Sequence, residues 1–112
     1  MKIHRLYTDD KGESHFEDME IEYVETTPSG RFTKRLPATG IIFREVQPTY
    51  ELDWHNAPRR QWCITLSGSV EIGIGDGTVK TFRPGDVFLA EDVTGQGHTA
   101  LPKDWVRAFV HL

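Results

Sequence analysis

Hydrophobic and polar positions alternate along this chain in short runs, and no run keeps a helical period beyond two turns. The clearest alternation lies in the second half, where Val70, Ile72 and Ile74 are separated by Glu71 and Gly73. A period of two is typical of a strand that buries one face. Glycine and proline interrupt the runs at short intervals, as they do between strands. The pattern therefore predicts an all-β chain.

Ten extended segments follow from this pattern, and tight turns are expected between them. The Gly75-Asp76-Gly77 stretch is a strong hairpin signal, because these residues tolerate positive φ. Ser67-Gly68 and residues 83–86 are expected to turn the chain, and residues 26–30 are expected to form a loop. Strands so closely spaced, with no helices between them, favour a closed antiparallel sheet. The expected strands are residues 3–7 (an edge strand), 16–24, 40–46, 51–55, 61–66, 70–74, 78–82, 87–90, 98–101 and 105–112.

Length and charge narrow the classes of function. The 112 residues fit one domain, 1–112, and the net charge of −4 comes without a basic cluster, so a nucleic-acid partner is not expected. No apolar run is long enough for a membrane span or a signal peptide. The lone Cys63 cannot form an internal disulfide, which agrees with a reducing compartment. We therefore expect a cytoplasmic protein.

Two segments carry a family resemblance. In residues 55–68, His55, Gln61 and Gly68 stand at the spacing of the first motif of the cupin superfamily, which has two histidines, an acidic residue or glutamine, and a glycine. Residues 77–98 resemble the second motif, in which a glycine-containing turn (here Pro84-Gly85-Asp86) precedes a strand, a loop and a histidine, here His98. The resemblance implies a small jelly-roll barrel, or double-stranded β-helix, with a site in its interior.

The resemblance also implies a set of metal ligands. Cupins bind a divalent first-row metal such as Fe, Mn, Ni or Zn through the motif residues. Carried over position by position, the candidates here are His55, Gln61 and His98. Ala57 occupies the second histidine position and cannot ligate, and Gln61 stands at the acidic position. The same two histidines, His55 and His98, are the candidate catalytic residues.

The chemistry of these side chains leaves two readings open. Two imidazoles and an amide oxygen can fill three metal positions and leave others open to substrate, yet they carry no negative charge. Such a site would suit an anionic substrate that completes the charge balance. Without a metal, the three form an ordinary polar pocket, in which His55 or His98 could still act as a general base near neutral pH.

Further candidates lie next to the motif residues. Arg59 and Arg60 are candidates for clamping a substrate carboxylate, although adjacent arginines are more often solvated or packed. Cys63 shares its parity with Gln61 along the strand and is a candidate pocket residue, although buried cysteine usually only packs. Glu91 and Asp92 precede His98, and surface solvation is their simpler interpretation.

Three classes of function remain. The first is a metal-dependent enzyme acting on a polar small molecule, by a dioxygenase, isomerase or similar reaction. The second is a metal-free module that binds or senses a small ligand, and the third is a structural protein whose barrel mainly dimerises. A homodimer is expected in any case, with strand 3–7 pairing across the partner.

Overall fold

The computed structural model describes residues 1–47, 50 and 52–112, and every regular element in them is a strand. The all-β class expected from the sequence is confirmed. Within these residues there is no helix of the length and apolarity needed to cross a membrane. The strands are β1 (Lys2–Thr8), β2 (Ser14–Glu20), β3 (Tyr23–Thr27), β4 (Gly30–Thr33), β5 (Gly40–Glu45), β6 (Leu52–His55), β7 (Gln61–Gly73), β8 (Val79–Phe82), β9 (Val87–Glu91) and β10 (His98–His111).

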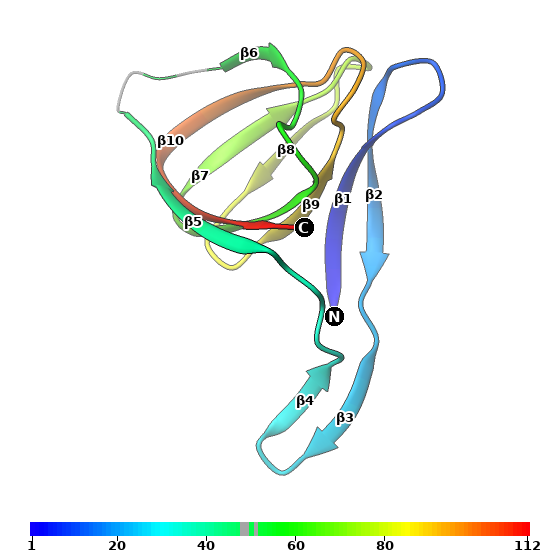
Figure 1. Cartoon of the computed structure of the whole chain (residues 1–112). Helices are drawn as coiled ribbons and strands as arrows, with labels where there is room; N and C mark the ends of the chain where they lie inside the picture. Colours follow the sequence, from blue (N-terminus) through cyan, green and yellow to red (C-terminus); the bar gives the residue numbers. More distant parts are fainter. Residues whose placement is uncertain (48–49, 51) are drawn as a thin grey trace.

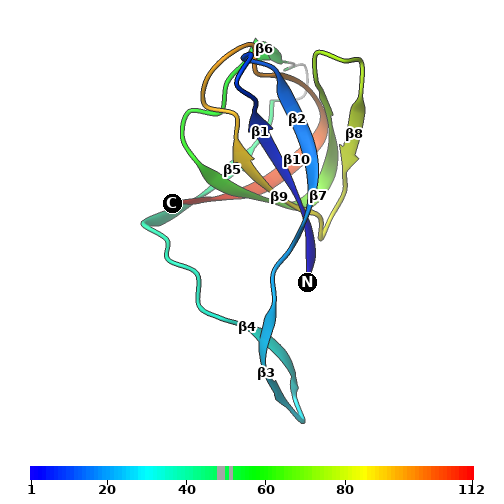
Figure 2. The same cartoon turned by 90° about the vertical axis from the view of Figure 1, so that its right-hand side faces the viewer.

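Eight of these strands form one strongly curved sheet. Its main path runs β2-β1-β9-β7-β10-β5, with β8 paired to β7 and β6 paired to β10. Figures 1 and 2 show the sheet curling into a barrel-like body, with β6 and β10 bordering the same end. All pairs are antiparallel except β1 with β9, which run parallel. The sheet is therefore mixed, and not purely antiparallel as expected.

The interior is built by alternate residues of the strands. On β7, Cys63 and Thr65 are buried while their neighbours are more exposed, which matches the period of two. Side chains from distant strands, among them Leu6, Phe82 and Phe88, meet in one cluster. Full burial of each such apolar side chain contributes about 1.5–3 kcal/mol, so this core is what holds the curved sheet together.

The expected turn at Ser67-Gly68 is wrong, because β7 runs through it as one strand of 13 residues. Gly68 instead lies at a bulge with φ of 68°, opposite a second irregularity at Asp104, whose φ is 48°. A Cβ atom on Gly68 would collide with the backbone oxygen of Asp104. Glycine is needed here because two backbones cross closely, and not because the chain reverses.

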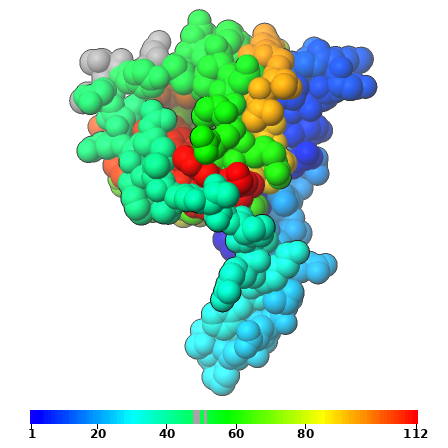
Figure 3. Space-filling view, in the orientation of Figure 1, coloured from blue at the N-terminus to red at the C-terminus, as the bar shows by residue number. Residues whose placement is uncertain are grey.

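The first half of the chain departs further from the expected strands. Strand β1 is not an edge, since it pairs with β2 on one side and β9 on the other. The expected strand 16–24 ends at Glu20, and residues 23–33 form a separate two-stranded sheet of β3 and β4. This hairpin, here called the arm, projects away from the body in Figures 1 and 3. The expected loop 26–30 is its tip.

Candidate functional site

A cavity of about 250 Å³ lies inside the curved sheet, and we call it the central cavity. It combines a mostly apolar wall with a small number of polar side chains, as small-molecule sites usually do. Its lining comes from β5, β6, β7, β9 and β10 and from the segments next to them. The lining residues are Arg44, Val46, Tyr50, Leu52, His55, Ala57, Pro58, Gln61, Ile72, Phe88, Ala90, His98, Ala100, Pro102, Trp105, Arg107 and Phe109.

His55 and His98 lie side by side in this lining. His55 ends β6 and His98 begins β10, and the antiparallel register places the two residues opposite each other. Their ring centroids are 4.3 Å apart, and the ring planes meet at 61°. Histidines 43 positions apart in the sequence thus form one pair, because β6 lies along the start of β10.

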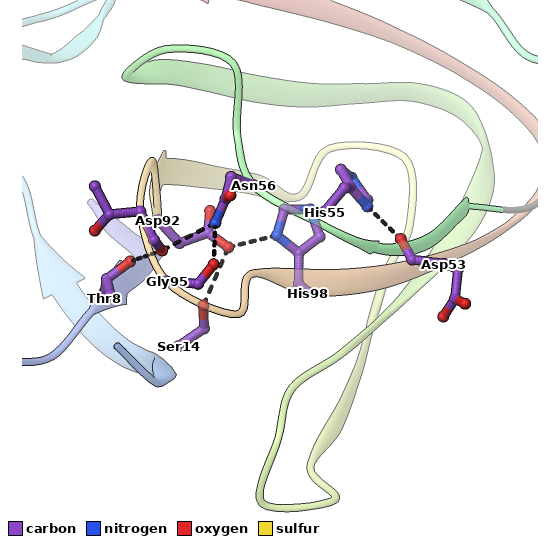
Figure 4. A network of polar contacts seen from close by, with 9 residues as sticks. Thr8, Ser14, Asp53, His55, Asn56, Asp92, Gly95 and His98 are labelled. Atoms are coloured by element: carbon purple, nitrogen blue, oxygen red, sulfur yellow. Dashed lines mark hydrogen bonds and ion pairs between the residues drawn. The ribbon is translucent and has the colours of Figure 1, made fainter. Parts of the chain in front are cut away.

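A buried carboxylate orients His98. Its Nδ1 atom lies 2.5 Å from Oδ2 of Asp92, and the hydroxyl of Ser14 donates to the same oxygen at 3.2 Å (Figure 4). Asp92 is 0% exposed, which corrects the expectation that it is a solvated loop residue. Since a carboxylate oxygen accepts, Nδ1 carries the proton, and Nε2 is the nitrogen available to a ligand.

His55 is oriented in the same sense by the backbone. Its Nδ1 atom lies 2.8 Å from the carbonyl oxygen of Asp53, which can only accept, so Nδ1–H donates and Nε2 is left with its lone pair (Figure 4). Desolvation, together with the neighbouring His98, lowers the pKa of His55 below its usual value, although the Asp53 hydrogen bond opposes this. The neutral ring is therefore favoured, and its Nε2 can take a proton or bind a metal.

The loop between β9 and β10 contacts the rest of the site through its backbone, which accepts side-chain hydrogen bonds and passes close to another segment. The Asn56 side chain donates to the carbonyl oxygens of Thr94 and Gly95, and Thr8 also donates to Thr94 (Figure 4). Gly97, with φ of 78°, passes so close to the His55 backbone that a Cβ atom would collide with the His55 carbonyl. These contacts hold the two histidines in one position relative to each other.

Gln61 and Ala57 also belong to the lining. Both are buried, and Gln61 is the first residue of β7. The three residues carried over from the cupin resemblance, His55, Gln61 and His98, therefore line one cavity. Ala57 lies in the same lining, so the position of the missing histidine is occupied by a methyl group.

The other candidates from the sequence lie elsewhere. Arg60 donates from Nε to Glu91 at 2.6 Å, and Nη1 of Arg59 lies 3.2 Å from Nδ1 of His111; neither arginine lines the central cavity. Cys63 is fully buried on β7 and also lies outside the lining, and desolvation raises the pKa of its thiol to about 12. The substrate-binding roles expected for these three residues do not fit their positions.

Two arginines that the sequence analysis did not single out lie in the lining instead. Arg44 on β5 and Arg107 on β10 are direct register partners, and both reach the central cavity. Their positions in two apolar strands carried no motif. Only the alternation along β10 could have pointed to Arg107, because it shares its parity with the buried Trp105 and Phe109.

The donors present allow a divalent metal but do not favour tight binding. Nε2 of His55, Nε2 of His98 and the amide oxygen of Gln61 are all neutral, and the described lining residues include no carboxylate. Two arginines in the same lining add positive charge. A first-row metal bound here would act as a Lewis acid and would need an anionic ligand to balance its charge.

A second group of possible metal ligands lies outside the cavity. Asp9, Glu13 and His15 offer three ligand atoms within 4.8 Å of one another, which is compatible with a divalent metal. Asp9 also has a structural role, because it accepts backbone hydrogen bonds from Lys11 and Glu13 and contacts His15 at 2.6 Å. These contacts account for the cluster as part of the β1–β2 turn.

Comparison with known proteins yields a likeness to solved structures. No family model matches the sequence, and no curated protein matches it. Among solved structures, the chain is similar to a protein from Ralstonia eutropha JMP134 that was provisionally named a mannose-6-phosphate isomerase. The likeness covers 100% of this chain and 86% of that protein, with 16% identity and a TM-score of 0.36. At that score it carries no argument about the ligand.

Proposed function

We propose that this protein binds a polar small molecule in the central cavity, with His55, Gln61 and His98 contacting its polar end. The observation that carries the proposal is the pair of histidine rings 4.3 Å apart in the lining, each with Nδ1 held and Nε2 available. Two such Nε2 acceptors in a largely apolar cavity would give a ligand both orientation and specificity. The cupin resemblance of residues 55–68 and 77–98 supports the same location.

A binding test follows directly. Purified protein is titrated with a panel of sugars, sugar phosphates, amino acids and hydroxy acids, and histidine side-chain NMR signals report contact. We expect saturable shifts of the His55 and His98 signals with at least one class, and calorimetry should show that the double change His55→Ala and His98→Ala abolishes binding of that compound. A His4→Ala variant is the control, because His4 is not a lining residue. Absence of any saturable shift contradicts the proposal.

The Asp92–His98 pair supports a form of this proposal in which the protein is an enzyme that acts on the bound molecule. A histidine whose Nδ1–H is held by a buried carboxylate can accept a proton at Nε2 and return it, as isomerisation of a polar molecule requires. His55, kept neutral by desolvation, is a second proton acceptor on the other strand. Catalysis would then consist of moving a proton between two positions of one bound molecule, with the apolar wall excluding water.

Metal analysis separates the metal-dependent version from the metal-free one. Near-stoichiometric Fe, Mn, Ni or Zn in the purified protein, lost in the His55→Ala and His98→Ala double variant, supports a metal-dependent enzyme. Metal retained in that variant but lost in Asp9→Asn assigns the ion to the β1–β2 turn instead. Metal-free protein that still binds a small molecule supports the general-base or sensor version.

A further inference from the structure

The wall of the central cavity contains a buried positive charge that has no counter-ion among the residues that the structure describes. Arg107 is 4% exposed, and its Nε atom has no hydrogen-bond partner among the described residues. Its Nη1 donates only to the backbone oxygen of Trp105, at 3.4 Å. Burying a guanidinium in this way is unfavourable unless its hydrogen bonds are completed, because the group stays charged.

Arg44 adds a second positive charge next to Arg107. It lies directly opposite Arg107 across the β5–β10 pair, where like charges repel. No ion pair joins either arginine to a carboxylate in the part of the chain that the structure describes. Desolvation first, and Arg44 second, lower the pKa of Arg107 from its ordinary value. The chain thus places two cations side by side in the cavity lining, the buried Arg107 and the exposed Arg44.

Aromatic rings make cation–π contacts with the two guanidinium groups. The guanidinium carbon of Arg107 lies 4.3 Å from the Trp105 ring centroid, and both arginines lie within 6 Å of the Phe109 ring, at 5.6 and 5.7 Å. A cation–π contact stabilises the charge and fixes the plane of the guanidinium, but it satisfies no N–H donor. The free donors therefore remain available to a ligand.

We propose that Arg107 and Arg44 bind the oxyanion group of the ligand, a carboxylate or a phosphate, inside the central cavity. This inference rests on the proposed function and names its substrate class: a small anionic molecule. The planar fork of a guanidinium matches both groups, and a charge-assisted pair would satisfy the unpartnered Nε. The anion would also offset the repulsion between the two arginines. His55 and His98 would then face the polar remainder of the same molecule.

The test uses pairs of probes of which one carries an oxyanion group and the other does not. Lactate is compared with lactamide, and glycerol 3-phosphate with glycerol, by calorimetry and by the NMR signals of the Arg107 side chain. We expect at least one anion of the two pairs to bind and its neutral twin to fail. Comparing lactate with glycerol 3-phosphate shows whether the site prefers a carboxylate or a phosphate. Arg107→Met should weaken anion binding at least about tenfold, because a charge-assisted pair is lost.

A matched variant and a second readout separate binding from folding. Arg60→Met removes an exposed arginine outside the cavity and should leave anion binding unchanged. Without ligand, Arg107→Met should be as stable as wild type or more stable, because a buried unpaired charge is removed. Destabilised ligand-free Arg107→Met, or equal binding of charged and neutral twins, overturns the inference. Binding of neutral probes alone leaves the proposed function standing, whereas binding of no compound in either panel contradicts both.

An independent observation concerns the arm, residues 23–33. Strands β3 and β4 pair only with each other, and a lone two-stranded hairpin is marginally stable in water. The arm nevertheless exposes apolar side chains: Val24 is 61% and Phe32 is 45% exposed. Strand β5, which follows it, exposes Ile41 and Phe43 on an edge. Apolar surface on a projecting hairpin and an open edge indicates a protein interface.

The charges on the arm identify the occupant. Glu25 lies on its first strand with Glu22 just before it, and Arg31 lies on its second strand with Lys34 just after it. None of these four residues makes an ion pair among the described residues. In a two-fold dimer each patch meets the same patch of the partner, so an acidic side meets a basic side twice. We infer that a second copy of this chain covers the arm and the β5 edge.

Sedimentation analysis from about 1 to 100 μM tests this inference. We expect a dimer that dissociates in Val24→Glu, because a charge enters the apolar contact. Val79→Glu is the matched control, since Val79 is 59% exposed on β8, away from the arm. A circular dichroism spectrum confirms that each variant folds. Wild-type protein that is monomeric throughout, or a dimer equally resistant to Val24→Glu, overturns the inference and assigns the arm to another partner.

Discussion

Asp92 and His98, the one fully buried and the other nearly so, are joined by a contact of 2.5 Å between Oδ2 and Nδ1. Ser14, from β2, donates to the same carboxylate oxygen, so three segments of the chain meet at this point. The second oxygen of Asp92, Oδ1, has no partner in the described part of the chain. The pair therefore fixes the orientation of His98 with one oxygen and leaves the other unsatisfied.

Replacing that carboxylate tests its positioning role. Asp92→Asn should lower the free energy of unfolding by about 1–3 kcal/mol, because a buried hydrogen bond to a charged group is lost. It should also change the ¹⁵N signals of His98 toward a mixture of tautomers, since an amide can donate as well as accept. Urea unfolding and histidine NMR measure the two effects. Asp76→Asn, at an exposed turn, is the control. An unchanged His98 tautomer contradicts the positioning role.

The stability of the protein should depend on the protonation of His55. Its folded-state pKa is lowered, chiefly by desolvation, so the unfolded chain binds more protons between that pKa and the ordinary value of about 6.5. Stability should therefore be complete above pH 6.5 and fall as the pH is lowered through this window. Urea unfolding at intervals from pH 7.5 to 5 measures the slope. In His55→Gln the slope should be smaller than in wild type. Equal slopes in the two proteins would contradict the assignment.

Two glycines with similar backbone angles should respond differently to a methyl group. Gly97 and Gly77 have φ of 78° and 90°, so alanine at either position costs about 1–2 kcal/mol for the left-handed conformation. At Gly97 the methyl group also meets the His55 carbonyl, whereas nothing lies within 4 Å at Gly77. Overpacking adds about 1–3 kcal/mol. Thermal unfolding should show the larger loss for Gly97→Ala, which should also weaken ligand binding. Equal losses would mean that the loop moves away freely.

Cys63 should be chemically inert in the folded protein. The thiol is fully buried, and desolvation raises its pKa to about 12, so the reactive thiolate is scarce at neutral pH. A disulfide reagent such as DTNB should label less than a few per cent of the native protein and all of it in denaturant. Rapid labelling of the native protein would show that the core around Cys63 opens. An unpaired, protected thiol is compatible with the cytoplasmic location expected from the sequence, which stays a prediction.

The local pattern was sufficient for the extended runs of the second half but not for their ends, because 61–66 and 70–74 belong to one strand, β7, and 98–101 and 105–112 belong to another, β10. Alternation along β7 and the hairpin at Gly75–Gly77 depend on backbone geometry and on one buried face, and both can be read from neighbouring residues. The cupin resemblance named His55, Gln61 and His98, and all three lie in the lining of one cavity, while their role as a site stays a prediction.

Contacts between segments far apart in the sequence decided the rest. Gly68 was expected to reverse the chain, and only the opposing backbone of Asp104 shows why it lies within a strand instead. The sequence suggested a solvated loop carboxylate at Asp92, whereas in the folded protein His98 and Ser14 both contact its side chain. Arg44 and Arg107 carry no motif, because their significance is a shared register across two strands. The sequence determines which face of each strand can be buried. Which charged side chains meet in the cavity, and which backbones approach closely, depends on how the folded sheet pairs its strands.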